Sequence, residues 1–283
     1  MSFISSLNII LPECITFFSC LLLIVIGVFF KNKKTIDFLT AIFYLLILCS
    51  LLFASKEGTT FGNSFVSTSF TIIIKFFIVS ISLFIFYITK DYLKNNNLNI
   101  FEYNILVLFI ILGMMIMVSA NDLMLLYLSI ELQSLSLYVL VALKKDSIRS
   151  SEAALKYFIL GSIASAIILY GSSMVYSVTG STNYLLIKET MINESSYTIF
   201  SFGLIFILSG IAFKLSAAPF HMWTPDVYEG APSSITTILI TLPKIAALCV
   251  LVKLLFEPFI NLIDVWKQIL IIVSISSMVI GSI

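Results

Sequence analysis

The chain has 283 residues, of which 60% are hydrophobic and only 11% are charged, and its mean hydropathy is +1.11. A soluble domain carries about a quarter charged residues, so this composition excludes a water-soluble globule and indicates a polytopic membrane protein. The net charge of +1, without any Lys/Arg-rich patch, argues against a nucleic-acid partner and leaves membrane lipids as the expected surroundings.

Nine apolar runs predict transmembrane helices, since about twenty helical residues cross a hydrocarbon core of about 30 Å. The runs are too long and too unalternating for barrel strands, so the expected fold class is all-α. The segment 179–197 is polar at both ends and is predicted to form a surface helix or a loop. The expected spans are 8–30, 36–54, 65–89, 103–120, 122–143, 153–178, 198–228, 233–256 and 266–283.

The basic residues of the links between spans predict the orientation. The second, fourth and sixth links carry only Lys56 and Lys188, whereas the odd-numbered links carry eight basic residues. By the positive-inside rule, the odd-numbered links face the inside and the N-terminus faces the outside. The eight basic residues are Lys31, Lys33, Lys34, Lys90, Lys94, Lys144, Lys145 and Arg149.

Cysteine and histidine usage argues against a redox centre in this chain. The four cysteines lie in apolar runs without metal-type or CxxC spacing, and we interpret them as small buried hydrophobic residues. The single histidine excludes a bis-His haem, and the sequence contains no iron–sulfur or flavin motif. We therefore expect no cofactor and no metal to be bound by this chain itself.

Most charges lie in links or near the predicted membrane edges, but four are predicted to lie deeper. They are Lys75, Glu131, Lys214 and Lys244. A charge at the centre of a membrane costs at least about 2.5–3.5 kcal/mol unless it faces a hydrated or paired interior. Such residues are candidates for function.

Glu131 follows Asn121 or Asp122, one of which is expected to cap the helix start, by about two and a half turns. This places the carboxylate near the middle of the membrane, where Gln133 and Ser134 could hold water beside it. The alternative is a structural ion pair that locks two helices.

Lys244 directly follows Pro243, which is expected to kink its helix and free a carbonyl that can recruit water. A packing kink without function is the alternative for this second position.

The stretch AFKLSAAPFHMWTPDVYEG, residues 212–230, predicts a broken helix at membrane depth. Pro219 and Pro225 each remove a backbone donor, and non-helical backbone survives there only inside protein or beside water. Transporters build ion sites at such breaks. His221 follows Lys214 by seven residues and would share its face if the helix continued, which favours a relay over a purely structural histidine. A nearby carboxylate favours the charged form of a buried lysine, so Glu131 is expected to control the proton on Lys214.

Four other charged residues receive lower priority. Lys75 has no acid, proline or histidine near it in the sequence, so we expect a structural partner or a shifted span. Lys156 follows Glu152 by four residues, the spacing of an ordinary helical ion pair. Asp226 and Glu229 are expected to cap the broken helix at the membrane surface, with a proton exit as the less favoured interpretation.

Four stretches carry a resemblance to a known family: LYLSIELQSLSLYVL (126–140), EAALKYFILGSIAS (152–165), FKLSAAPFHMWTPDVYEGAPSSIT (213–236) and LPKIAALCVL (242–251). Together they closely resemble subunit 2 of proton-pumping NADH:quinone oxidoreductase, respiratory complex I. The resemblance covers most of the chain from about residue 100 onward and is weaker before it. The FHMWTPDVYEG run is the most specific part.

The resemblance implies an antiporter-like membrane subunit with two inverted repeats, each containing a broken helix. It implies proton-translocating roles for Glu131, Lys214 and Lys244, with His221 as a relay between the lysines. It also implies that NADH, FMN, iron–sulfur clusters and ubiquinone belong to other subunits of the parent complex. Other membrane-arm subunits are the implied partners.

The chain is shorter than the family, and its second repeat stops soon after it begins. The expected division is an N-terminal group of three helices at 1–100, a first antiporter-like five-helix repeat at 101–256, and the truncated start of a second repeat at 257–283. A subunit split between two genes, with a second chain supplying the missing repeat, is the favoured explanation. A partial sequence is the alternative.

Two other functions remain open from the sequence, namely an independent multisubunit cation/proton antiporter and a structural complex I subunit without pumping. The frequent Phe, Ile, Tyr, Asn and Lys, with a single Arg, are typical of an AT-rich genome. This composition predicts a multi-pass protein of the mitochondrial inner membrane, with a bacterial plasma membrane as the alternative.

Overall fold

The computed structural model describes residues 3–29, 33–54, 57–96, 98, 101–190 and 197–282. Within these ranges, nine helices are long and apolar enough to cross a membrane, and the predicted all-α class is confirmed. The nine helices are α1 (Phe3–Phe29), α2 (Lys33–Phe53), α3 (Ser69–Asn95), α4 (Phe101–Ser119), α5 (Leu123–Val141), α6 (Ile148–Thr179), α8 (Tyr197–Lys214), α10 (Ser233–Phe256) and α11 (Ile263–Ser282).

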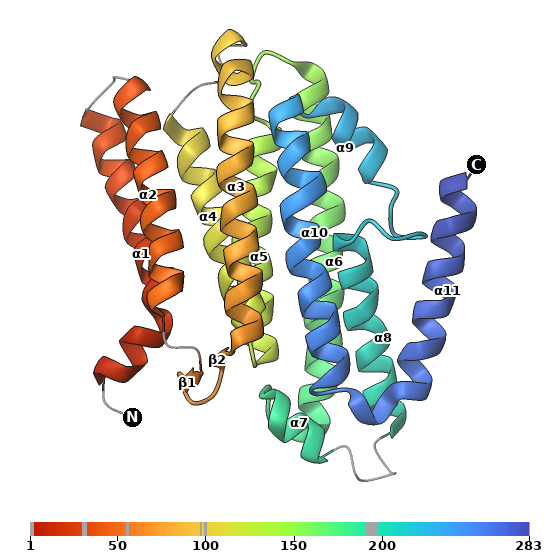
Figure 1. Cartoon of the computed structure of the whole chain (residues 1–283). Coiled ribbons are helices and arrows are strands. Elements are labelled where there is room, and N and C mark those ends of the chain that lie inside the picture. The colour runs from red at the N-terminus through yellow and green to blue at the C-terminus, as the bar shows by residue number, and fades with distance from the viewer. Residues whose placement is uncertain are drawn as a thin grey trace.

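Successive long helices run in opposite directions, so the links alternate between the two ends of the bundle (Figure 1). The C-terminal ends of α1, α3 and α5 lie together at the top of the view. A hairpin of strands β1 (Gly58–Thr60) and β2 (Phe65–Ser67) lies at the bottom with α7 (Tyr184–Thr190). This alternation agrees with the predicted sidedness of the basic links, although Lys31 and Lys56 lie outside the described residues. The short helix α7 confirms the expected surface helix in the segment 179–197.

The third predicted span is corrected at both ends. Its first residues form strand β2 (Phe65–Ser67), which pairs antiparallel with β1 (Gly58–Thr60), and the helix begins only at Ser69. Thr68 and Thr71 form a reciprocal capping box that fixes this start. The helix then continues to Asn95 through residues that were predicted as a polar link, because Lys and Asn are tolerated where a helix emerges from the apolar layer.

The hairpin, the α4–α5 link and the start of α7 are joined by hydrogen bonds at the bottom end of the bundle. The Asn121 amide N–H donates to the Ser64 carbonyl over 2.8 Å, and the Tyr184 amide donates to the Asn121 carbonyl over 3.1 Å. Asp122 both accepts from the Thr182 hydroxyl at 2.6 Å and caps α5. Three links that are distant in sequence are therefore joined by hydrogen bonds at this end of the bundle.

Helices α6 and α8 pack closely because glycines face each other at their crossing. A Cβ atom at Gly171 would lie 2.6 Å from the Gly203 carbonyl oxygen, and one at Gly210 would meet the side chain of Ile168. Small residues of this kind let two membrane helices approach until their backbones touch. The crossing holds α8, and with it Lys214, against α6.

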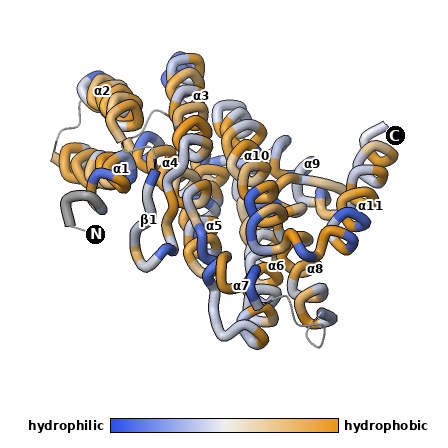
Figure 2. Tube along the Cα trace, turned by 60° about the horizontal axis from the view of Figure 1, so that its bottom comes forward, coloured by the Kyte–Doolittle hydropathy of each residue, from blue (hydrophilic) through white to orange (hydrophobic). Residues whose placement is uncertain are grey.

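Hydrophobic residues cover most of the helical length, and polar residues gather toward the ends and links (Figure 2). Helix α4 is the most enclosed of the spans, whereas α11 has no buried residue along its described length. Of the cysteines, Cys20 and Cys249 are buried as predicted. The prediction was wrong for Cys49, which is exposed on α2, and only partly right for Cys14, which is half-buried.

Candidate functional site

Helix α5 places Glu131 at its centre. Asp122 is the N-cap, and its carboxylate accepts from the amides of Met124 and Leu125, so the second of the two predicted caps is confirmed. Glu131 is the ninth residue after this cap, about two and a half helical turns along α5. Ser134 lies one turn further on, on the same face as Glu131. The cap and the helix period thus fix the depth and direction of the carboxylate.

Ser134 links α5 to α8. The Lys214 ammonium donates to the Ser134 hydroxyl over 2.7 Å, and it lies 6.0 Å from the centroid of the Tyr138 ring. No ion pair joins Lys214 to Glu131 or to another carboxylate within the described ranges. One Glu131 oxygen and the Tyr138 hydroxyl are buried without a hydrogen-bond partner among the described residues. Lys214 is therefore held by a neutral hydroxyl, one helical turn from a carboxylate.

The predicted helix break is confirmed, and it begins directly after Lys214. Residues 215–223 are non-helical, and the chain resumes as α9 (Thr224–Gly230). Within the break, Ser216 has a left-handed φ of 59° and the Ala218–Pro219 peptide is cis. The prediction that Pro225 also interrupts the helix is wrong, because Pro225 lies in the first turn of α9, where its missing N–H costs nothing.

The break is held on one side by aromatic stacking. The Trp223 ring stacks on Tyr157 of α6 at 4.6 Å and on Phe213 at 5.5 Å between ring centroids. The indole N–H of Trp223 also donates to the Phe213 carbonyl over 3.1 Å. These contacts fix the end of the break against α6.

Two serines of α11 hold the other side of the break. The Ala218 amide donates to the Ser277 hydroxyl over 3.0 Å, and the Ser276 hydroxyl donates to the Ala218 carbonyl over 2.9 Å. Sequence reasoning missed both serines, although the run SISS (274–277) places hydroxyl groups inside an apolar span, where they need hydrogen-bond partners. The two hydroxyls are hydrogen-bond partners for the backbone amide and carbonyl of Ala218, which have no helical partner in the break.

His221 and Lys244 line one cavity of about 360 Å³ beside the break. Ser277, Ile280 and Gly281 of α11 also line the cavity, and the Lys244 ammonium lies 5.6 Å from the centroid of the Tyr228 ring. The shared face of His221 and Lys214 was predicted only for a continuous helix, and the helix ends at Lys214. The structure instead brings His221 to Lys244. Pro243 lies inside α10, directly before the lysine, as predicted.

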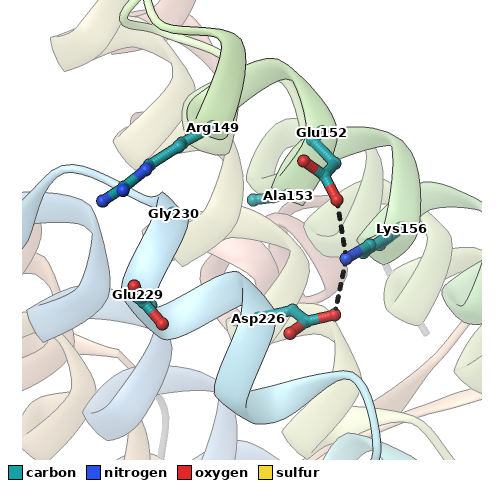
Figure 3. Close-up of a pocket in the computed structure, with 7 residues that line it drawn as sticks. All are labelled: Arg149, Glu152, Ala153, Lys156, Asp226, Glu229 and Gly230. Atoms are coloured by element: carbon teal, nitrogen blue, oxygen red, sulfur yellow. Dashed lines mark hydrogen bonds and ion pairs between the residues drawn. The ribbon is translucent and has the colours of Figure 1, made fainter.

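Lys156 occupies a pocket of about 190 Å³ between α6 and α9 (Figure 3). Its ammonium pairs with Glu152 at 2.8 Å, which confirms the expected helical pair, and also with Asp226 at 2.7 Å. The prediction that Asp226 and Glu229 cap the broken helix is wrong, because the start of α9 has no side-chain cap and Asp226, in its first turn, pairs with Lys156. Glu229 lines the same pocket and makes no ion pair among the described residues. The cluster attaches α9 to α6.

Lys75 has a buried structural partner that sequence reasoning missed. Its ammonium lies 2.6 Å from a carboxylate oxygen of Glu13 in α1, and the two side chains are 2% and 4% exposed. Glu13 was wrongly placed among the charges near a membrane edge. Both expectations for Lys75 are confirmed, since it has a partner and its span begins four residues later than predicted.

Polar atoms without partners concentrate around Lys214 and the break. Among the described residues, the buried side-chain atoms that lack a hydrogen-bond partner include those of Glu131, Gln133, Tyr138, Ser216, His221, Thr224 and Tyr228. Buried polar groups are almost always satisfied by protein or by ordered water, so this region is expected to hold water. In the described residues, no group of three or more His, Cys, Asp or Glu side chains is placed to hold a metal ion. The available chemistry is proton exchange among a carboxylate, two amines and an imidazole.

Residues 120–283 match the family described as NADH:quinone oxidoreductase/Mrp antiporter, transmembrane. This match covers more than half of the chain. The chain belongs to this family.

Similar proteins extend the comparison over nearly the whole chain. NADH-quinone oxidoreductase subunit N of Pelagibacter ubique is 44% identical over 98% of this chain and 59% of its own length. A chain of respiratory complex I from Thermus thermophilus with bound aureothin is 28% identical, with a TM-score of 0.74 over 86% of this chain and 52% of that one. A chain of the Mrp complex from Dietzia sp. shares the fold, with a TM-score of 0.74 and 18% identity over 88% of this chain and 49% of that one. The chain thus spans about three fifths of the length of its curated relatives.

Proposed function

We propose that this chain is an antiporter-like membrane subunit of respiratory complex I and takes part in proton translocation coupled to NADH:ubiquinone electron transfer in other subunits. The proposal is supported by similarity to subunit N and by the complex I chain of Thermus thermophilus. The observation that carries it is the unpaired Lys214 at the helix break, held by Ser134 beside Glu131.

The residues would act in two groups. Glu131, Ser134 and Lys214 form the first, in which neutralising the carboxylate would change whether the lysine keeps its proton. His221 and Lys244 form the second, because they line one cavity at the break. Water among the unpartnered polar atoms would connect the two groups, with His221 as the relay.

The helix-breaking residues would support these groups without exchanging protons themselves. Pro219 keeps the segment after Lys214 non-helical, and Pro243 precedes Lys244 inside α10. Lys156 and Asp226 attach α9 to α6, so we assign them a positioning role, with Glu229 as a polar neighbour. The three-part division at residues 100 and 256 remains a proposal.

Two other functions are weighed against this one. An independent cation/proton antiporter is favoured by the fold shared with the Mrp complex, but that likeness rests on 18% identity against 44% for subunit N. A structural subunit without pumping would have no need for an unpaired lysine beside a carboxylate. The loss of pumping on mutation of Lys214 separates the structural role from the proposed one.

The proposed partners are other membrane-arm subunits, and a second chain carrying the further repeat remains part of the proposal. NADH, FMN, iron–sulfur clusters and ubiquinone would belong to the parent complex and not to this chain. The relatives named above are bacterial, which favours a bacterial plasma membrane over the mitochondrial inner membrane that the composition predicted.

A native gel of solubilised membranes, stained for NADH oxidation and followed by mass spectrometry of the band, tests the assignment. We expect this chain in the NADH-active band together with other complex I subunits. Its presence in a smaller particle without NADH activity would overturn the complex I assignment and favour the independent antiporter. Pumping by vesicles that contain Glu131→Gln in place of the wild-type chain then tests the role, with Ser173→Ala on the exposed face of α6 as the matched control.

A further inference from the structure

A groove of about 280 Å³ lies between the start of α3 and the end of α10, on the side of the hairpin. Thr68 and Thr71 line it at the first turn of α3, and Lys253 and Glu257 line it at the last turn of α10. Both helices end here, so the groove lies at the level where spans meet the membrane surface. The proposed proton path does not use any of these residues.

One of the residues that line the groove carries a buried ammonium without a hydrogen-bond partner among the described residues. Lys253 is only 9% exposed, and its ammonium has no hydrogen-bond partner among the described residues. It interacts electrostatically with Glu257 and with Lys75, but Lys75 is already paired with Glu13. A buried ammonium without hydrogen bonds is costly, so an acceptor from outside the chain is expected at this point.

The start of α3 adds a second attraction for negative charge. This helix has 27 residues, and the amides of Thr68 and Thr71 are already satisfied by the capping box. The aligned peptide dipoles still leave a partial positive charge at the helix start, where phosphate groups commonly bind. A helix start and an unpartnered lysine therefore line the same groove.

The walls of the groove are suited to acyl chains. Phe70, Val252 and Phe256 line it, and they are 50%, 48% and 56% exposed. Large exposed apolar side chains at the end of a span face the region between headgroups and hydrocarbon. A free phosphate ion would have no use for these walls, whereas a phospholipid would cover them.

Glu257 restricts the headgroup. Burial raises the pKa of its carboxyl above the usual value, and the lysines Lys253 and Lys188 act in the opposite direction. A carboxylate at the rim of the groove repels a headgroup with net negative charge and attracts an amine. The pair of Lys253 and Glu257 is thus complementary to a zwitterion.

We propose that this groove binds one zwitterionic phospholipid with a primary amine, with its phosphate against Lys253 and the start of α3. Its amine lies against Glu257, and its acyl chains lie along Phe70 and Phe256. The proposal does not rest on the proton-translocating function, because a lipid can bind here whether or not the chain pumps.

Native mass spectrometry of the purified complex in detergent, with phosphatidylethanolamine and phosphatidylglycerol added in equal amounts, tests the site. We expect the wild type to retain one phosphatidylethanolamine that Lys253→Met binds about tenfold more weakly, as expected for the loss of a charge-assisted hydrogen bond. Lys253→Arg should retain the lipid because it keeps the charge. Lys267→Met, which changes an exposed lysine five residues into α11, is the matched control and should also retain it.

Glu257→Gln tests the headgroup and leaves the buried lysine intact. We expect the variant to keep one phospholipid but to lose the preference for phosphatidylethanolamine over phosphatidylglycerol. If Lys253→Met fails to assemble, a photoreactive residue at the exposed position Phe70 replaces it, and cross-linking to phosphatidylethanolamine is expected. Equal lipid binding by wild type and Lys253→Met, an unchanged preference in Glu257→Gln, or no lipid cross-link from position 70 would each overturn the proposal.

Discussion

Lys75 and Lys214 are two lysines within membrane spans that differ in what holds them. Lys75 is 1% exposed and lies 2.6 Å from the carboxylate of Glu13, inside an unbroken helix. Lys214 is half-buried, ends its helix, and donates to the neutral hydroxyl of Ser134. Beside Lys214, the side chains of Glu131, Gln133 and Tyr138 carry buried polar atoms without hydrogen-bond partners among the described residues.

The difference separates a structural charge from one that can switch. A carboxylate in contact fixes the proton on Lys75, because removing either charge would leave the other buried and unpaired. A hydroxyl can hold Lys214 whether the amine is charged or neutral, since it both donates and accepts. Burial alone therefore does not identify a proton carrier, whereas the partner does.

The largest expected effect follows from breaking the structural pair. Glu13→Ala leaves Lys75 as an uncompensated buried charge, and we expect a loss of about 3–5 kcal/mol in stability. Little assembled protein should reach the membrane, as measured by the abundance of the complex on a native gel.

A double variant makes this result specific. Glu13→Gln combined with Lys75→Met removes both charges, and we expect it to restore most of the assembly because no charge is then left unpaired. Equal loss in the single and double variants would contradict the assignment of the pair as a structural ion pair.

Lys214→Met should have the next largest effect, on activity and not on assembly. The variant removes the exchangeable proton, so we expect proton pumping to fall by about tenfold or more, within the range for loss of a positioned acid or base. Pumping is measured as dye quenching in inverted vesicles at equal complex content. A variant that pumps at the wild-type rate would show that Lys214 carries no proton.

A smaller effect is expected from moving the helix that carries Lys214. Gly171→Ala places a methyl group against the Gly203 carbonyl oxygen at the α6–α8 crossing. This oxygen belongs to the backbone, so the two helices must move apart to make room for the methyl group. Overpacking of this kind costs about 1–3 kcal/mol, so we expect a lower melting temperature and reduced pumping. Ser173→Ala lies two residues away on an exposed face and should match the wild type in both.

The smallest effect is expected at the exposed ion pair of Lys156 and Asp226. Lys156 is a third lysine to compare with Lys75 and Lys214. Lys156 and Asp226 are about half exposed, so water screens their attraction. Asp226→Asn should leave the melting temperature unchanged within error and lower pumping only through a looser attachment of α9. A melting temperature that falls as far as in Gly171→Ala would show that the pair is a main support of the fold.

The sequence predicted what depends on local pattern. Span number, the Asp122 cap, the break after Lys214 and the Lys156–Glu152 pair each follow from periodicity, capping or spacing within a few residues. Three other features do not follow from local pattern, because their members come from helices and links distant in sequence. They are the Glu13–Lys75 pair, the hydrogen bonds of Ser276 and Ser277 to the break, and the hydrogen bonds that join the hairpin to the α4–α5 link and to α7. The resemblance placed His221 between Lys214 and Lys244, but helical spacing could not locate its side chain because the helix ends at Lys214.

The most direct test gives the same substitution to both lysines of the comparison. Arginine keeps the positive charge but does not release its proton in proteins, so it separates a structural charge from a proton carrier. The measurement is the number of protons pumped per NADH oxidised, in vesicles that contain Lys75→Arg or Lys214→Arg. The account predicts wild-type pumping per complex for Lys75→Arg and a strong loss for Lys214→Arg. Wild-type pumping by Lys214→Arg would contradict it.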